Sequence, residues 1–180
     1  MSHREISQDD WIVCSDSEVI DNERLVQERG PDLMETGGVG PCLGIAIVIE
    51  DVGCLMHINS PSATVSTATE PFFDSIRRLS TPDARRQAFP ILFGCYAMRL
   101  GGHDEELAES AESDWNWAKE KLSKLGFAGI LERRGDEKSS KTLLIDRLRG
   151  RLILETYWDD GPTETECFSW NSRETAVRID

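Results

Sequence analysis

The residues best suited to chemistry in this 180-residue chain are a cysteine and a histidine fifteen positions apart. Cys42 follows the glycine-rich stretch T-G-G-V-G-P and precedes an apolar run, and His57 lies near the end of the next apolar run. A thiol performs acyl-transfer chemistry when a neighbouring base raises its thiolate fraction. Thr36, six residues before the cysteine, is a candidate third member that orients the imidazole. These residues predict a cysteine nucleophile with a histidine base.

The turn between the two apolar runs decides whether thiol and imidazole meet. If residues 50 and 51 are the central pair of a hairpin, His57 lies opposite Gly44. Cys42 is then the diagonal neighbour of His57 on the same face of the sheet. In that register Gly44, which has no side chain, leaves room for a substrate. A turn one residue later moves His57 opposite Ala46 and separates the pair, and a bulge would shift the register either way.

The glycine-rich stretch before the cysteine predicts a tight turn with exposed N–H groups. Such groups stabilise a tetrahedral oxyanion, so Gly38, Gly40 and Gly44 are candidate oxyanion or turn residues. Pro41 has no N–H to donate. The donors would therefore have to be the amide of Cys42 and another nearby group. Two plainer alternatives stay open, in which Cys42 is a small apolar core residue and the histidine is a hydrogen-bonded residue at a strand end.

Composition narrows the classes of function. With 39% hydrophobic and 29% charged residues, the chain has the composition of a soluble domain with a sizeable core. The net charge of −13 argues against a nucleic-acid partner, because phosphates favour clustered Lys and Arg. No apolar run has the length of a transmembrane helix, and the polar N-terminus lacks a signal peptide. Five scattered cysteines without a CxxC motif suggest no disulfide framework and no zinc site, so neither metal nor cofactor is predicted.

Hydrophobic patterning predicts several strands and two helices. The predicted strands cover residues 11–14, 43–49, 53–58, 88–98, 129–132, 141–146 and 151–157. One helix is predicted to begin at Glu70-Pro71 with Thr69 as its cap, and another to run from Ser113 or Asp114 to Gly126. Residues 18–29 are expected to be either helix or flexible lead-in, and residues 159–180 a polar tail or strapped-on segment.

In this order, the motifs resemble the CheD family of chemoreceptor glutamine deamidases, from about Met34 to Tyr157. The signature of that family is a threonine, a turn ending in L-G-S-C, an apolar strand and G-G-M-x-H. The matching stretches here are T36-G-G-V-G-P-C42 and G53-C-L-M-H57. The Cys-to-His spacing also resembles that of the cytotoxic necrotizing factor and Burkholderia lethal factor deamidase toxins. The chain departs from the family pattern by Pro41 in place of serine, Val39 in place of leucine, and Cys54-Leu55 in place of Gly-Met.

The resemblance implies an α/β fold, a sandwich of mixed, largely antiparallel β-sheet with flanking helices. The deamidase domain would cover residues 34–158, between an N-terminal lead-in of residues 1–33 and a polar C-terminal segment of residues 159–180. The implied activity is that of a cofactor-independent, cysteine-dependent protein-glutamine glutaminase. In it, Cys42 is the nucleophile, His57 the base and Thr36 the residue that orients the histidine. Its partner would be a protein substrate bearing a reactive glutamine.

Two other functions stay open on the same residues. One is a different Cys-His acyl hydrolase, such as a peptidase or amidase. The other is a non-catalytic CheD-like binding module, which Pro41 at the oxyanion turn favours. A chemotaxis role and an effector role are both compatible with the sequence. The corresponding locations are the cytoplasm, or a host cell reached by secretion without a Sec signal peptide. The sequence predicts neither the target protein nor the oligomeric state.

Overall fold

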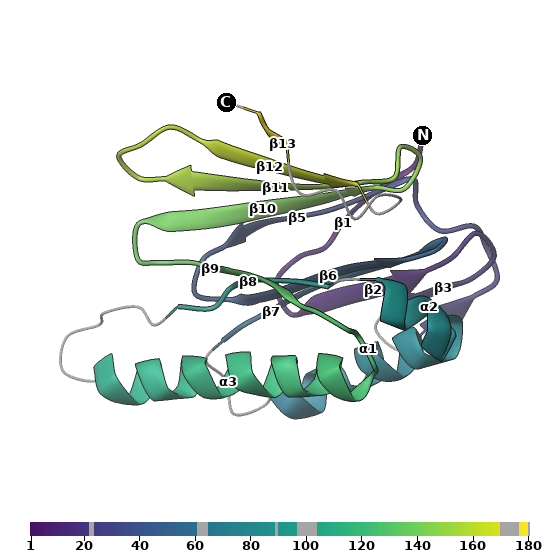
Figure 1. Cartoon of the computed structure of the whole chain (residues 1–180), viewed down its shortest axis with the longest axis horizontal. Helices are drawn as coiled ribbons and strands as arrows, with labels where there is room; N and C mark the ends of the chain where they lie inside the picture. The colour runs from purple at the N-terminus through teal and green to yellow at the C-terminus, as the bar shows by residue number, and fades with distance from the viewer. Residues whose placement is uncertain (22–23, 61–64, 89, 97–103, 170–176, 180) are drawn as a thin grey trace.

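The computed structural model has two stacked β-sheets, one of which is covered by helices on its outer face (Figure 1). It describes residues 1–21, 24–60, 65–88, 90–96, 104–169 and 177–179. The six-stranded sheet has the order β1-β5-β10-β11-β12-β13, and the seven-stranded sheet has the order β4-β3-β2-β7-β6-β8-β9. The strands of the first sheet are β1 (His3–Glu5), β5 (Leu33–Val39), β10 (Ser139–Asp146), β11 (Arg151–Trp158), β12 (Glu164–Ser169) and β13 (Val177–Ile179). Those of the second are β2 (Asp10–Cys14), β3 (Val19–Asp21), β4 (Arg24–Val26), β6 (Leu43–Ile49), β7 (Val52–Ile58), β8 (Ile91–Gly94) and β9 (Leu131–Arg134).

Both sheets are largely antiparallel, with one parallel pair in each, β1 with β5 and β8 with β9. The helices in the described residues are α1 (Val65–Leu79), α2 (Pro82–Gln87) and α3 (Asp104–Lys124). They lie below the seven-stranded sheet in Figure 1, with the six-stranded sheet above it. The prediction of an α/β sandwich of mixed, largely antiparallel sheet with flanking helices is therefore confirmed. Among the described residues, none of these helices has the length and apolar character needed to cross a membrane.

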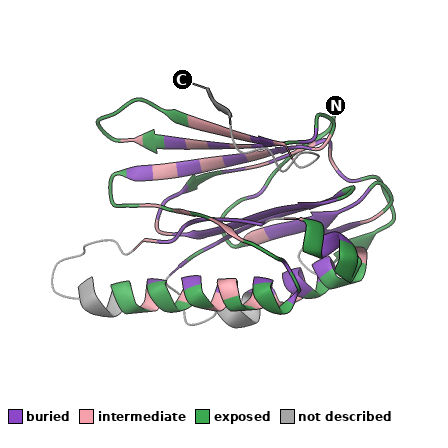
Figure 2. Cartoon of the chain, viewed as in Figure 1, coloured by how far each residue is buried: buried purple, intermediate pink, exposed green. Residues whose placement is uncertain are grey.

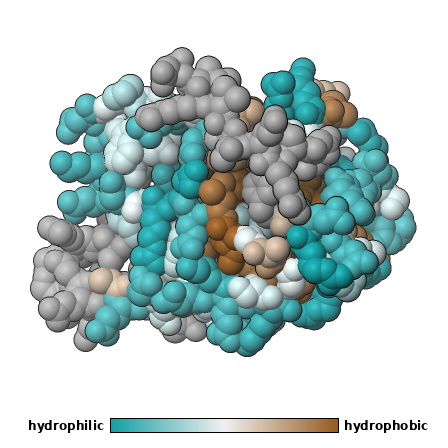
Figure 3. Space-filling view, viewed as in Figure 1, coloured by the Kyte–Doolittle hydropathy of each residue, from teal (hydrophilic) through white to brown (hydrophobic). Residues whose placement is uncertain are grey.

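Two apolar cores follow from this layering, one on each face of the seven-stranded sheet. Strand alternation sends Ile45, Ile47 and Met56 toward the helices, where they pack with Phe72 and Trp115. The alternate residues point between the sheets and pack against the buried side chains of the six-stranded sheet. Because both faces are covered, every residue of β6 and β7 is buried (Figure 2). Figure 3 shows hydrophobic residues in the middle of this view, surrounded by hydrophilic ones.

The β6–β7 hairpin has the first of the two registers considered for it. Its turn consists of Glu50 and Asp51, so that Ile49 pairs with Val52 and Gly44 with His57. Glu50 has a φ of 54°, in the left-handed region that a two-residue hairpin turn requires. This register puts Cys42, just before β6, on the same face as the histidine.

Both chain ends contribute more to the fold than their sequences predict. Residues 1–33 are not a lead-in, because they supply β1 to one sheet and β2, β3 and β4 to the other. The stretch 18–29, expected as helix or flexible chain, contains the short strands β3 and β4. Similarly, the segment 159–180 supplies β12, which pairs with β11 along its length. The strand predicted over residues 11–14 is β2. The strands β1, β3 and β4 escape sequence analysis because each has three residues and gains its stability from pairing with other strands rather than from local pattern.

The helices are longer than predicted and the strand after α2 is shorter. Helix α1 begins five residues before Glu70 and contains Pro71 in its interior, so Thr69 is not its cap. Helix α3 begins at Asp104 rather than at residue 113 or 114. The predicted strand 88–98 is realised as β8 alone, and residues 89, 97 and 98 of that prediction lie outside the described residues.

The space above Gly44 is occupied, contrary to the expectation that it leaves room for substrate. Gly44 pairs with Phe93 of β8, and a Cβ atom at Gly44 would lie 2.4 Å from two carbon atoms of the Phe93 ring. The glycine therefore admits an aromatic core side chain rather than a ligand.

This contact predicts that Gly44→Ala lowers the free energy of unfolding by about 1–3 kcal/mol, the usual cost of overpacking. Urea denaturation measures the effect. Gly129→Ala is the matched control, because a Cβ there meets no atom within 4 Å. Combining Gly44→Ala with Phe93→Leu should recover part of the loss. Equal stability of the Gly44 and Gly129 variants would contradict the packing described.

Candidate active site

A hydrogen bond between the two sheets joins two of the three predicted site residues. Thr36 lies on β5 of the six-stranded sheet and His57 on β7 of the seven-stranded sheet. The hydroxyl oxygen of Thr36 lies 2.9 Å from Nδ1 of the His57 ring. Both residues are buried, with 0% and 4% of their surface exposed. The contact predicted between threonine and histidine is therefore present, and it uses the hydroxyl group rather than the backbone carbonyl.

The partners of the Thr36 hydroxyl decide the tautomer of the histidine. The hydroxyl donates its one hydrogen to the carbonyl oxygen of Ile6, at 2.8 Å. A hydroxyl has one hydrogen, so its oxygen must accept from the ring, and Nδ1 of His57 carries the proton. Nε2 then has a free lone pair. This Nε2 atom is buried and has no hydrogen-bond partner among the described residues. The site therefore holds a ring nitrogen whose lone pair is free, and a general base needs such a lone pair to accept a proton.

Cys42 lies on the same face of the sheet as His57. The register Gly44 to His57 makes Cys42 the diagonal neighbour of the histidine, and its side chain belongs to the core between the sheets. The thiol is 6% exposed. No hydrogen bond links its sulfur to the unpaired Nε2 atom. In this structure the thiol and the base are diagonal neighbours that share no hydrogen bond.

Burial is the main influence on the acidity of both groups. It raises the pKa of the Cys42 thiol and lowers the pKa of His57, because desolvation disfavours each charged form. Two backbone N–H groups, those of Ser60 and of Cys42 itself, act in the opposite direction and lower the pKa of the thiol. Burial therefore favours the uncharged form of each group, and the ionised forms depend on these N–H groups and on nearby charge.

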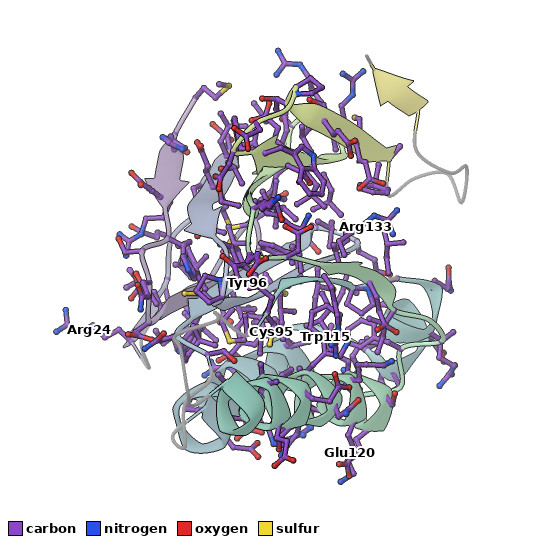
Figure 4. The ribbon with its side chains drawn as sticks, turned by 90° about the vertical axis from the view of Figure 1, so that its left-hand side faces the viewer. Arg24, Cys95, Tyr96, Trp115, Glu120 and Arg133 are labelled. Carbon is purple, nitrogen blue, oxygen red and sulfur yellow. The ribbon has the colours of Figure 1, made fainter. Side chains whose placement is uncertain are left out.

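Ser60 is held in place from the helix layer. It is 2% exposed, and its hydroxyl donates to Oδ2 of Asp114 on α3 at 2.6 Å. The same hydroxyl lies 3.4 Å from the sulfur of Cys95. Because Ser60 lies two residues after the end of β7, this link restrains the backbone N–H group that lowers the pKa of Cys42. In Figure 4, Cys95 lies toward α3 and Tyr96 lies beyond it, farther from the helix.

The predicted oxyanion glycines fall in three different environments. Gly38 has a φ of 68° and lies exposed inside β5, where the pairing of that strand with β10 shifts register. The N–H of Gly40 donates to the carbonyl of Gly38 at 3.0 Å, so the turn itself uses that donor. Gly44 lies inside β6, which pairs with strands on both sides. The donors that act on the thiol are instead the two N–H groups named above.

The half-buried side chain of Tyr96 packs beside the turn before Cys42. A Cβ at Gly40 would lie 3.4 Å from its hydroxyl oxygen, and one at Gly135 would lie 2.9 Å from its ring. Burial raises the pKa of Tyr96, and the negative charge of ionised Cys42 is among the smaller causes. Tyr96, which follows β8 two residues after its end, thus lies beside the turn that leads to Cys42.

Sequence reasoning missed Ser60, Ile6 and Asp9. The side chain of Asp9 accepts a hydrogen bond from the N–H of Asn59 at 2.8 Å, and its charge raises the pKa of both Cys42 and His57. Ser60 could have been found from its place two residues after the predicted strand that carries His57. Ile6 and Asp9 carry no such signal, because their roles depend on pairing across about 30 and 50 residues of chain.

The remaining cysteines differ from Cys42 in their surroundings. Cys54 points into the helix-side core, the face opposite His57, as strand alternation predicts. Burial raises the pKa of Cys54 well above its ordinary value and that of Cys14 and Cys95 to about 11. Cys167 on β12 is half-buried. Of the four buried thiols, Cys42 is the one that two backbone N–H groups act on.

Comparison with protein-family models and with curated proteins finds no match for this chain. Among the described residues, no group of three or more His, Cys, Asp or Glu side chains is placed to hold a metal ion.

The Thr36–His57 contact predicts a specific tautomer. In nitrogen-15 NMR spectra at neutral pH, Nδ1 of His57 should carry the proton and Nε2 should not. Thr36→Val removes the hydroxyl, so the single tautomer should give way to a mixture. The variant should also lose about 1–3 kcal/mol of stability, because a buried donor and a buried acceptor lose their partner. Thr142→Val on the neighbouring strand β10 is the control. A proton on Nε2 in the wild-type protein would contradict this account.

The Ser60–Asp114 link predicts a change in the reactivity of Cys42. Ser60→Ala should slow alkylation of Cys42 by iodoacetamide by about fivefold, because the N–H that stabilises the thiolate is no longer held in position. Peptide mass spectrometry after timed labelling measures the rate at this one cysteine. Ser75→Ala is the matched control, since Ser75 is similarly buried but bonds to Pro71 within α1. Equal rates in the two variants would show that the link does not affect the thiol.

Proposed function

We propose that this chain is a protein glutamine deamidase that uses Cys42 as nucleophile and His57 as base. The observation that carries the proposal is the Thr36–His57 hydrogen bond. It leaves Nε2 of the histidine unprotonated, buried and unpaired, on the same face of the sheet as a thiol. Thr36 is also the residue that the resemblance to the CheD family assigns to orienting the histidine.

The reaction follows from the roles of these groups. Nε2 of His57 takes the proton of Cys42, and the thiolate attacks the amide carbon of a glutamine side chain. A C–S bond forms and the carbonyl oxygen becomes an oxyanion, which the N–H groups of Cys42 and Ser60 stabilise. Nε2 returns its proton to the amide nitrogen, and ammonia leaves as the C–N bond breaks. A water molecule, deprotonated by Nε2, then hydrolyses the thioester to glutamate and the free thiol.

The hydrogen bond to Thr36 supports this cycle at each step. The Nδ1 proton stays on the ring throughout, because the Thr36 oxygen accepts from it whether the ring is neutral or charged. Proton transfer is thereby confined to Nε2, on the other side of the ring. Pro41 does not prevent oxyanion stabilisation in this scheme, since the two N–H groups come from residues 42 and 60.

A non-catalytic binding module is the second candidate, and the surroundings of the Cys42 thiol favour it. The thiol is 6% exposed, burial raises its pKa, and it makes no hydrogen bond with the unpaired Nε2 atom. For catalysis, the Cys42 thiol and Nε2 of His57 must form a hydrogen bond when substrate binds. Catalytic hydrogen bonds often form only in the complex with substrate, so the resting geometry is compatible with both candidates.

The test is incubation of the protein with a library of glutamine-containing peptides. Deamidation should release ammonia and convert glutamine to glutamate in the peptide mass spectra, and Cys42→Ser and His57→Ala should each abolish both signals. Cys54→Ser is the matched control and should keep the activity, because Cys54 lies on the opposite face of the hairpin. Circular dichroism shows whether each variant is folded.

Each other outcome identifies a different function. Cleaved peptides in place of deamidated ones would indicate a peptidase that uses the same residues. Loss of activity in Cys54→Ser with retention in Cys42→Ser would reverse the assignment of the nucleophile. No product from folded wild-type protein with any peptide in the library would favour the binding module.

A further inference from the structure

Asp9 lies at the end of the seven-stranded sheet where the site is built. It belongs to the turn before β2, and the next residue, Asp10, pairs with His57 across β2 and β7. Oδ1 of Asp9 accepts the N–H of Asn59 at 2.8 Å. Continuing the β6–β7 register by one position places Asn59 opposite Cys42. The carboxylate is therefore attached to the segment that passes directly beside the proposed nucleophile.

The charge of Asp9 is available to act on the site. Its side chain is exposed, and no described cation forms an ion pair with it. Tyr96 is another titratable side chain near Cys42, and Thr36 faces the histidine from the other sheet. The backbone of Cys95 bonds to that of Cys42, but its side chain lies in the helix-side core. Asp9 is the one charged side chain that affects the ionisation of both reacting groups in the described part of the chain.

We propose that Asp9 is a specificity residue of this site, whose negative charge, at the end of the sheet that carries Cys42 and His57, excludes carboxylates from the position of the substrate amide. The exclusion rests on the proposed function, because glutamine is neutral and its product glutamate is an anion. A carboxylate beside the thiol would repel the product while accepting the amide, and so favour product release. The substrate class that follows is an uncharged carboxamide.

The backbone at Asp9 makes one substitution especially informative. Asp9 has a φ of 63°, in the left-handed region that asparagine adopts about as readily as aspartate. Asp9→Asn therefore keeps the turn, and its side-chain oxygen can still accept the N–H of Asn59. The charge is the property that changes. Asp10→Asn is the matched control, since that carboxylate accepts from the N–H of Trp11 and acts on neither reacting group.

The experiment compares alkylation of Cys42 by neutral iodoacetamide and by anionic iodoacetate, each followed by peptide mass spectrometry across a pH series. At low salt, Asp9→Asn should lower the amide-to-acetate rate ratio at Cys42 by about threefold or more, the effect of one partly screened charge. The dependence of the Cys42 alkylation rate on pH should also shift as a whole to lower pH in Asp9→Asn. Asp9 raises the pKa of both groups, so removing its charge lowers both. High salt should reduce the difference between variant and wild type.

The outcomes separate this inference from the proposed function. An unchanged rate ratio and pH profile in Asp9→Asn, or equal changes in Asp10→Asn, would overturn the role of Asp9. The alkylation readout does not need deamidase activity. If the ratio changes but no glutamine peptide is deamidated, the deamidase proposal fails and the electrostatic role stands. If the wild-type protein deamidates peptides, glutamate-containing product should inhibit Asp9→Asn more strongly than wild type, and equal inhibition would overturn the specificity role.

Discussion

The register of the β6–β7 hairpin is the constraint on which the site depends. Because side chains alternate along a strand, a shift of one residue would turn His57 toward the helices and away from the six-stranded sheet. The two-residue turn at Glu50-Asp51 prevents that shift, with Glu50 in the left-handed conformation. On the other side of β6, the packing of Phe93 over Gly44 supports the register between β6 and β8, since a side chain at position 44 would collide with the ring. The histidine can meet Thr36 across the sheets only in this arrangement.

The second requirement is that the layers on both sides of the seven-stranded sheet contribute to the site. The six-stranded sheet contributes Thr36, which fixes the tautomer of His57 and is itself held by the carbonyl of Ile6. The helix layer contributes Asp114, whose hydrogen bond holds Ser60 and so restrains the N–H that lowers the pKa of the thiol. The six-stranded sheet thus controls the position of the proton on His57, and the helix layer controls the position of a hydrogen-bond donor.

Charge adds a third control over a site that burial alone would keep neutral. Desolvation raises the pKa of Cys42 and lowers that of His57, so burial favours the uncharged form of each group. Forming thiolate and imidazolium therefore needs compensation from the surroundings. The backbone N–H groups favour the thiolate and Asp9 favours the imidazolium, although Asp9 also opposes the thiolate. A polar substrate that forms a hydrogen bond with Nε2 would complete this compensation in the proposed reaction.

The sequence by itself determined the features that depend on short stretches of chain. These are the hairpin with its two possible registers, the middle parts of the two predicted helices, and the candidate residues Cys42, His57 and Thr36. These follow from patterns within short stretches, because strand alternation and helix periodicity are local properties. Only the tertiary structure decided that the Thr36 hydroxyl meets Nδ1, that Phe93 fills the space above Gly44, and that residues 1–33 supply four strands. It also decided the parts played by Ser60 and Asp9. Such contacts join strands, sheets and helices that lie far apart in the chain, and their geometry is set by how the layers pack together.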